Sequence, residues 1–248
     1  MIELIATMFA IGLVVGFIGA GGSGFILSVL TTVFGFSIHL ASGTALAAMA
    51  FTTSVGALSH LRERNVAPSI GLIMGALGAV GALLTSRLAA HLPAAELRVL
   101  TAVILFVAAV LLWVRLVLTQ RLRERRQSQP RWRRAVYSAL IGLGAGGISG
   151  LFGIGAAPFI QLGLLTVLGV PERQAAGTTM LVIIPTALAG AIGYARAGFL
   201  DFRLLAEVVA GTAVGSYLGA KLTQRLPRRY LRAAMIIVPA IGGGILLS

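Results

Sequence analysis

The feature that most constrains this chain is the length of its uncharged segments. Between Glu3 and Arg62 lie 58 residues without Lys, Arg, Asp or Glu, and between Arg134 and Glu172 lie another 37. A membrane-spanning helix needs about 20 predominantly apolar residues, so each run is long enough to cross a bilayer. Only 11% of the 248 residues are charged, against about 25% in an ordinary soluble domain. We therefore expect an integral membrane protein and exclude a soluble enzyme of ordinary composition.

The placement of the charges excludes other classes. The formal net charge is +13, but the basic residues stand in short loops between apolar segments, whereas a nucleic-acid-binding protein spreads them over a soluble face. The chain has no cysteine, which excludes a disulfide framework, thiolate metal sites and a cysteine nucleophile. We expect the lipid bilayer as a partner, and we expect no nucleic acid, no metal and no cofactor.

The chain consists of two similar halves. Residues 16–112 align without a gap on residues 150–246, a shift of 134, with 27 identical pairs. The identities cluster, as where Gly43-Thr44 matches Gly177-Thr178. A single ungapped register indicates a duplication rather than shared composition.

Each half contains four apolar segments, and residues 115–134 separate the halves. The segments span about residues 4–33, 40–60, 69–90, 96–114, 135–168, 174–195, 204–220 and 230–248. Residues 115–134 hold eight arginines and no apolar periodicity, which indicates a solvated connector. We expect an all-α polytopic membrane protein with seven or eight membrane segments, in which repeat 1 (1–114) and repeat 2 (135–248) are joined by this connector.

The first segment of each half is interrupted. Residues 19–24 (GAGGSG) and 153–158 (GIGAAP) lie inside segments of about 30 residues, where glycine disfavours a helix and Pro158 removes a backbone donor. Each interrupted segment is either one long kinked helix or two half-helices that meet at a re-entrant turn. Three full transmembrane helices follow it in each half.

The distribution of Lys and Arg favours the re-entrant alternative, because cytoplasmic loops are enriched in these residues. If both interrupted segments enter and leave on one side, the halves are inverted and 16 basic residues lie on the side of the connector, against 4 on the other. If both segments span, the split is 12 against 8. We expect inverted repeats, with the connector 115–134 in the cytoplasm.

The two interruptions are candidate anion sites. In inverted-repeat transporters, paired broken helices direct their N-termini, with free N–H groups and the positive end of the helix dipole, at an anion near the midplane. Close helix packing is the alternative, because small residues also let backbones approach. Two dense, symmetric interruptions favour binding. The candidate substrate-binding residues are Gly21, Gly22, Ser23 and Gly24, with Gly155, Ala156 and Ala157.

A second set of candidates begins the next segment of each half. Ser42-Gly43-Thr44 and Gly177-Thr178-Thr179 place hydroxyl groups at a helix start, where they can bond a substrate oxygen. Helix capping and hydrogen bonds to the carbonyls of the same helix are the alternative roles, which Ser and Thr commonly take. The sequence leaves both open.

Small residues recur every four positions in both halves, at Gly71 and Gly75 and at Gly211, Gly215 and Gly219. Such stripes serve helix contacts within a chain or between subunits. They are compatible with a homodimer formed through these faces.

Few ionisable residues stand inside the apolar segments. Glu207 is one, but Arg203 precedes it by one helical turn, so we expect an interfacial salt pair. No carboxylate pair or Ser/His/Asp set lies inside the membrane segments, so neither a proton-relay pump nor an enzyme is expected, and we predict no catalytic residues.

The interrupted opening from Val15 to Gly24, the Ser42-Gly43-Thr44 that follows, and their second-half counterparts resemble the TauE/SafE family, also called sulfite exporters, within the 4-toluene sulfonate uptake permeases. The resemblance covers nearly the whole chain. It implies an inner-membrane carrier for sulfite, organosulfonates or related small organic anions. By motif match it adds Gly19 and Gly153 to the candidates, and it repeats Gly21, Gly22, Gly43, Thr44, Gly155, Gly177 and Thr178. The second half departs from the pattern at Ala156-Ala157-Pro158.

We therefore expect a secondary transporter that moves a small sulfur-containing anion by alternating access between inverted halves. A passive anion channel is the alternative, and a membrane-embedded enzyme is a weaker one.

Overall fold

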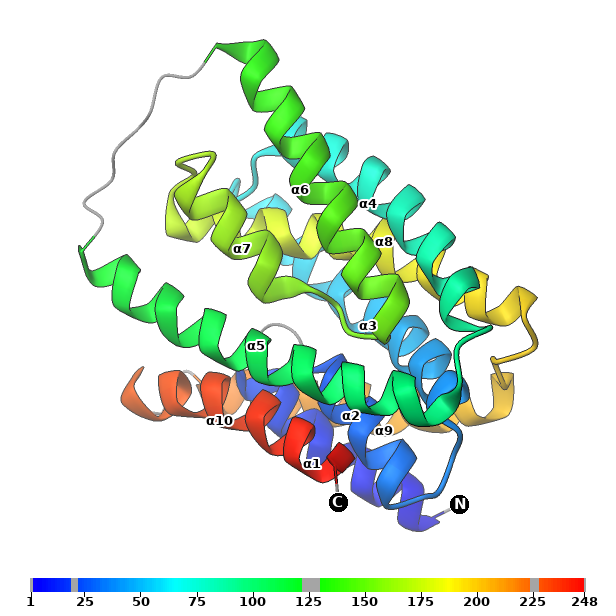
Figure 1. The fold of residues 1–248 in the computed structure, drawn as a ribbon. Helices are drawn as coiled ribbons and strands as arrows, with labels where there is room; N and C mark the ends of the chain where they lie inside the picture. Colours follow the sequence, from blue (N-terminus) through cyan, green and yellow to red (C-terminus); the bar gives the residue numbers. More distant parts are fainter. Residues whose placement is uncertain (1, 19–21, 122–129, 224–227, 248) are drawn as a thin grey trace.

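The computed structural model describes residues 2–18, 22–121, 130–223 and 228–247. Within these ranges the chain forms ten α-helices and no β-strand (Figure 1), which confirms the expected all-α class. In chain order the helices are α1 (Ile2–Ile18), α2 (Ser23–Thr32), α3 (Ile38–Arg62), α4 (Pro68–Ala89), α5 (Ala94–Arg121), α6 (Arg131–Phe152), α7 (Ala157–Thr166), α8 (Glu172–Arg196), α9 (Phe202–Thr223) and α10 (Arg228–Leu247).

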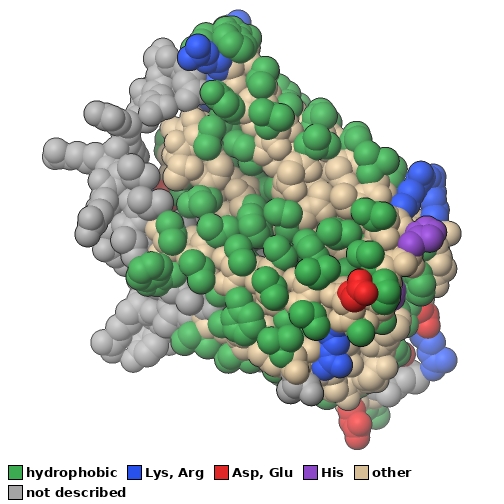
Figure 2. All heavy atoms as spheres, viewed as in Figure 1, with side chains coloured by type: hydrophobic (Ala, Val, Ile, Leu, Met, Phe, Trp, Pro, Cys, Tyr) green, Lys and Arg blue, Asp and Glu red, His purple; other side chains and the backbone are tan. Residues whose placement is uncertain are grey.

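The surface of the molecule is apolar, as a lipid environment requires. Five of the described helices, α3, α4, α5, α6 and α8, contain a window long and apolar enough to cross a membrane. Large apolar side chains such as Leu72, Leu84 and Val110 are more than half exposed. Hydrophobic side chains cover most of the face in Figure 2, and charged side chains lie mainly toward its margin. The protein is a multi-pass membrane protein.

The helix boundaries repeat with the register found in the sequence. The bounds of α2, α3 and α4 and those of α7, α8 and α9 all differ by 134 residues. Two sharp turns repeat as well, because Gly35 and Gly169 both have positive φ, at 69° and 61°. Both turns follow a short helix of ten residues, α2 or α7.

The equivalent helices α3 and α8 lie antiparallel. Near the start of α3, a Cβ on Gly43 would meet the carbonyl oxygen of Phe199, which follows the end of α8. Near the start of α8, a Cβ on Gly177 would meet the carbonyl oxygen of Asn65, which follows the end of α3. Phe199 is 134 residues after Asn65, so both ends of this helix pair make the same contact. Such matched, reversed contacts are what inverted repeats predict.

The first helix of each half packs against a helix of the other half. Helix α1 packs along α9, and its equivalent α6 packs along α4. Glycines allow the close approach: a Cβ on Gly12 would lie 2.7 Å from the carbonyl oxygen of Thr212, and one on Gly146 would collide with the backbone of Gly78. Because of this exchange the halves interlock. The division into two repeats at residues 115–134 stays a prediction from sequence.

The glycine stripes contact helices of the same chain. Gly71 and Gly75 of α4 face Leu181 and Pro185 of α8, and Gly211 and Gly215 of α9 face the backbone of α1. The contacts of Gly219 lie outside the described part. These contacts account for the described glycines of the stripes, and the homodimer stays a prediction.

The basic residues separate to two ends of the helix bundle. The end that holds the α3–α4 loop and the starts of α6 and α8 carries Arg62, Arg64, Arg131, Arg133, Arg134 and Arg173. The opposite end holds the starts of α3, α5 and α9 and carries Arg87, Arg98, Arg196 and Arg203. In Figure 1, α7 returns toward the end at which α6 begins. The positive-inside rule places the first end in the cytoplasm. Residues 122–129 of the connector lie outside the described part. The connector is helical on either side of them, because α5 extends to Arg121 and α6 begins at Arg131.

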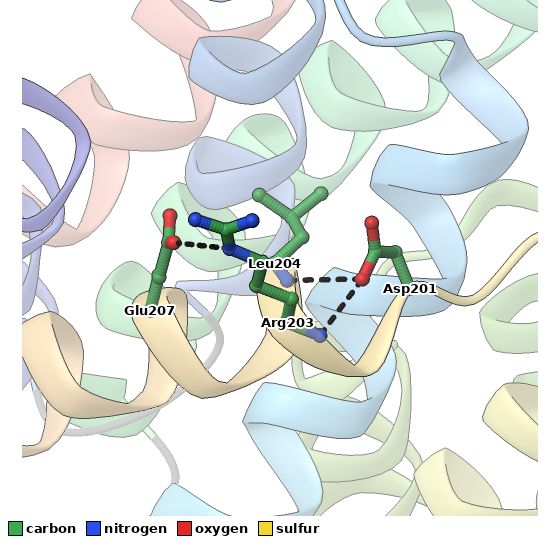
Figure 3. Close-up of polar contacts among 4 residues, drawn as sticks. All are labelled: Asp201, Arg203, Leu204 and Glu207. Atoms are coloured by element: carbon green, nitrogen blue, oxygen red, sulfur yellow. Dashed lines mark hydrogen bonds and ion pairs between the residues drawn. The ribbon is translucent and has the colours of Figure 1, made fainter. Parts of the chain in front are cut away.

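The expected Arg203–Glu207 pair is confirmed at the start of α9 (Figure 3). Arg203 Nε lies 3.5 Å from Glu207 Oε1. Asp201 precedes the helix, and its Oδ1 accepts hydrogen bonds from the backbone N–H of Arg203 (2.7 Å) and Leu204 (3.3 Å). The carboxylate thus caps α9, as Asp commonly does at a helix start.

The glycine packing of α4 against α6 yields a stability prediction. In Gly146→Ala the new methyl group collides with backbone atoms of Gly78, which cannot swing aside, so we expect a loss of about 1–3 kcal/mol in unfolding free energy. Gly144, in the same helix, has no neighbour within 4 Å of an added Cβ, so Gly144→Ala serves as the control and should be neutral or stabilising. Thermal unfolding in detergent measures both. Equal unfolding temperatures for the two variants would contradict this packing.

Candidate functional site

The interruptions expected from sequence are present in both halves. Helix α1 ends at Ile18 and α2 begins at Ser23, while α6 ends at Phe152 and α7 begins at Ala157. Two predicted site residues, Gly19 and Gly21, lie outside the described residues. The described parts, Gly22–Gly24 and residues 152–157, are buried. Irregular backbone at membrane depth is tolerated where the protein itself covers it, and the described residues of both interruptions meet this condition.

The backbone of the second interruption is strained. Gly153 has φ 68°, and Ala156 has φ 43° although it carries a Cβ. The left-handed conformation costs a non-glycine residue roughly 1–2 kcal/mol. Such strain persists where the surroundings fix the conformation, and it concentrates at functional sites. The equivalent residue of the first half, Gly22, has φ −76°, in the right-handed region, so the two turns differ in backbone conformation.

A hydrogen bond joins the two interruptions. The backbone N–H of Gly155 donates to Ser23 Oγ at 2.8 Å, and both residues are buried. A Cβ on Gly24 would lie 3.4 Å from Ile154 Cγ2, so the start of α2 lies against the turn between α6 and α7. The predicted residues Gly22, Ser23, Gly24 and Gly155 are therefore brought together in the structure.

This meeting point lies beside the middle of α3. Met49 is the twelfth of 25 residues in that helix, and a Cβ on Gly155 would collide with its thioether. A residue at the centre of a spanning helix lies near the bilayer midplane. The two interruptions thus meet at the depth where inverted-repeat transporters bind their substrates.

The electrostatic character of the site favours an anion. Helices α2 and α7 begin at the interruptions, and neither has an acidic residue in its first turn or a side-chain cap. The N–H groups of Phe25 and Phe159 donate to the carbonyls of Gly22 and Ala156, and Pro158 has no N–H, so the candidate donors are the first one or two amides of each helix, at the positive end of its dipole. Two helix starts of this kind within hydrogen-bonding reach of each other attract negative charge without a buried cation.

The start of α3 carries two hydroxyl side chains, Ser42 and Thr44, which point to different faces of the helix because they are two residues apart. Ser42 lies against Gly153, since a Cβ on that glycine would be 2.5 Å from Ser42 Oγ. Thr44 is fully buried, and its Oγ1 has no hydrogen-bond partner in the described part of the chain. A buried, unsatisfied hydroxyl is costly, which suits a group that a ligand completes.

The equivalent hydroxyl groups of α8 have structural partners. Thr178 Oγ1 accepts a hydrogen bond from the N–H of Ala67 at 2.9 Å, and Thr179 Oγ1 donates to the carbonyl of Ala175 at 2.8 Å. Gly43 and Gly177 lie near opposite ends of α3, about 25 Å apart at 1.5 Å per helical residue. The structure therefore does not bring Gly177, Thr178 and Thr179 together with the residues at the meeting point.

Among the buried polar side chains that were not sequence candidates, two belong to the helices that flank the second interruption. Ser149 Oγ of α6 and Gln161 Oε1 of α7 lack a partner in the described ranges. Ser149 lies four residues before Gly153, and Gln161 lies four residues after Ala157. A single amide in the otherwise apolar sequence APFIQLGLLT of α7 is a signal that sequence alone offers for Gln161.

Comparison with known proteins gives a consistent picture. A family model described as "Sulfite exporter TauE/SafE" matches residues 4–246. The "Probable membrane transporter protein YdhB" of Bacillus subtilis (strain 168) is 46% identical over 245 residues, 98% of this chain and 99% of that protein. The "Probable membrane transporter protein YjnA" of the same organism is 28% identical over 93% of this chain and 94% of its own length. A "Probable membrane transporter protein" of Xylella fastidiosa (strain 9a5c) is 26% identical over 87% of this chain and 82% of its own. No solved structure matches the chain significantly.

The hydrogen bond between the interruptions yields a second prediction. In Ser23→Ala the buried N–H of Gly155 loses its acceptor, which costs about 1–3 kcal/mol, so we expect lower thermal stability and a loss of anion binding. The control is Ser28→Ala, because Ser28 Oγ donates to the carbonyl of Gly24 within its own helix at 2.7 Å. Thermal unfolding with and without a test anion measures both effects. If the two variants behave alike, the Ser23 contact has no special role.

Proposed function

The chain belongs to the TauE/SafE family, and from this premise we propose that it is a secondary transporter that moves a small sulfur-containing or organic anion, such as sulfite, sulfoacetate or another organosulfonate, by alternating access. The family and the names of the relatives establish that the chain is a membrane transporter. The contact between Ser23 and Gly155 supports the proposed anion substrate and mechanism, because it joins two helix starts at the depth of the midplane.

The chemistry of this contact suits a sulfonate or sulfite group. Such a group offers several oxygen acceptors and no strong donor of its own, and the helix starts offer N–H donors. Binding through dipoles rather than a fixed cation leaves the anion free to dissociate, which a carrier needs. Ser42, which lies against Gly153, adds a hydroxyl donor beside the second interruption.

Different packing of the two halves supports alternating access. Helix α4 packs closely along α8, whereas the equivalent α9 makes a much smaller contact with α3. The glycines that permit the first contact, Gly71 and Gly75, are replaced at the equivalent positions by Leu205 and Val209. Two similar halves in unequal arrangements are expected when a carrier is open to one side.

A passive channel for anions is the alternative function, and transport assays distinguish the two. In proteoliposomes that contain the purified full chain, a carrier loaded with unlabelled anion accumulates labelled anion transiently, and its flux saturates. We expect such counterflow for at least one of sulfite, sulfoacetate and ethanesulfonate. Flux that rises linearly with concentration, without counterflow, would instead indicate a channel.

Alternating access also predicts state-dependent crosslinks, for which the absence of native cysteine is convenient. Gly71→Cys with Leu181→Cys joins α4 to α8, which touch in the described state. The equivalent pair, Leu205→Cys with Ala47→Cys, joins α9 to α3 and should form only in the opposite state. We expect each disulfide to arrest counterflow and a reducing agent to restore it. Full counterflow with the first crosslink in place would contradict the mechanism.

A further inference from the structure

Gln161 is a buried residue whose side-chain carbonyl oxygen is left unsatisfied within the described part of the protein. It lies in α7, is 3% exposed, and its Oε1 has no hydrogen-bond partner in the described part of the protein. The loss of hydration of a buried carbonyl oxygen is unfavourable unless a donor replaces the water. A partner from outside the chain would supply that donor.

Helix geometry directs this side chain toward the meeting point of the interruptions. Gln161 stands one turn after Ala157 on the buried face of α7, which also includes Ile160 and Leu164. Side chains on a helix lean toward its N-terminus, so a long side chain at this position covers the turn that precedes it. That turn is the start of α7, next to Gly155.

The other half shows that the fold does not require an amide at this position. Leu27 of α2 is the equivalent residue, 134 positions earlier, and it is fully buried. A leucine thus fills the corresponding space in the first half. The amide is specific to the second half, in the same helix that follows the strained Ala156.

We propose that Gln161 Oε1 accepts a hydrogen bond from the transported anion, so that the protein prefers small anions that also carry a hydroxyl or amino donor. The inference rests on the proposed function, in which the helix starts bind the anionic group. Gln161 then recognises the opposite end of the same molecule. The expected substrate class is a hydroxylated or aminated small sulfonate or carboxylate rather than a simple alkyl one.

The test compares two pairs of anions that differ by one hydroxyl group. Ethanesulfonate and 2-hydroxyethanesulfonate form one pair, and acetate and glycolate form the other. Each competes with a labelled anion for counterflow by the full chain in proteoliposomes. With the native protein we expect the hydroxylated member to compete about tenfold better, the effect of one buried hydrogen bond.

Two variants test whether Gln161 is the source of this preference. Gln161→Leu introduces the residue of the first half, and Gln161→Met keeps an unbranched side chain in case the first does not fold. In either, the ratio within each pair should fall to about one while counterflow of the simple anion persists. Ser28→Ala, which removes a buried hydroxyl bonded within its own helix, should keep the native ratio.

The outcomes distinguish a failure of the role proposed for Gln161 from a failure of the proposed transport function. Counterflow with no preference for the hydroxylated anion, or with a preference that survives in both variants, overturns the role of Gln161 and leaves the transporter intact. No competition by any of the four anions, together with no counterflow, overturns the proposed function and this inference with it.

Discussion

The structure depends on one constraint, that backbone N–H and carbonyl groups inside a bilayer must find partners within the protein. Unbroken helices satisfy it locally, and most of the described chain is helical. The two interruptions are exceptions, and their described residues are buried. Where an N–H of the second interruption needs an acceptor, Ser23 of the other half supplies it to Gly155. The candidate site therefore lies where the constraint is hardest to meet.

Glycine serves two different purposes in meeting this constraint. In α1, α4, α6 and α9 it lets helix backbones approach, as where Gly146 lies against Gly78 and Gly12 against Thr212. At Gly153 it permits a left-handed turn that ends a helix. The first use holds each half to the other, since α1 packs on α9 and α6 on α4. This interlocking keeps both interruptions covered.

The sequence predicted the scaffold better than the site. The all-α class and the interruptions followed from uncharged runs, glycine clusters and the 134-residue register, because hydropathy and helix propensity act locally. The partners of hydroxyl groups did not follow, since they depend on tertiary contacts: Thr178 bonds Ala67 across the bundle, whereas the equivalent Thr44 has no partner in the described chain. Gln161 did not stand out among the residues that are identical in the two halves, because the equivalent residue of the first half is Leu27.

Differences between the halves carry more information about function than identities do. Identical positions such as Gly43 and Gly177 make the same backbone contact at both ends of the α3–α8 pair, so they maintain the scaffold in either half. Unequal positions cannot serve a symmetric purpose. A carrier must hold one substrate, which is itself asymmetric, between two nearly equivalent halves. One half must then supply a group that the other lacks. Gln161 and Leu27, which occupy equivalent positions of the two halves, differ in this way. A perfectly symmetric site would bind either end of such an anion equally and would lose the ability to distinguish its two ends.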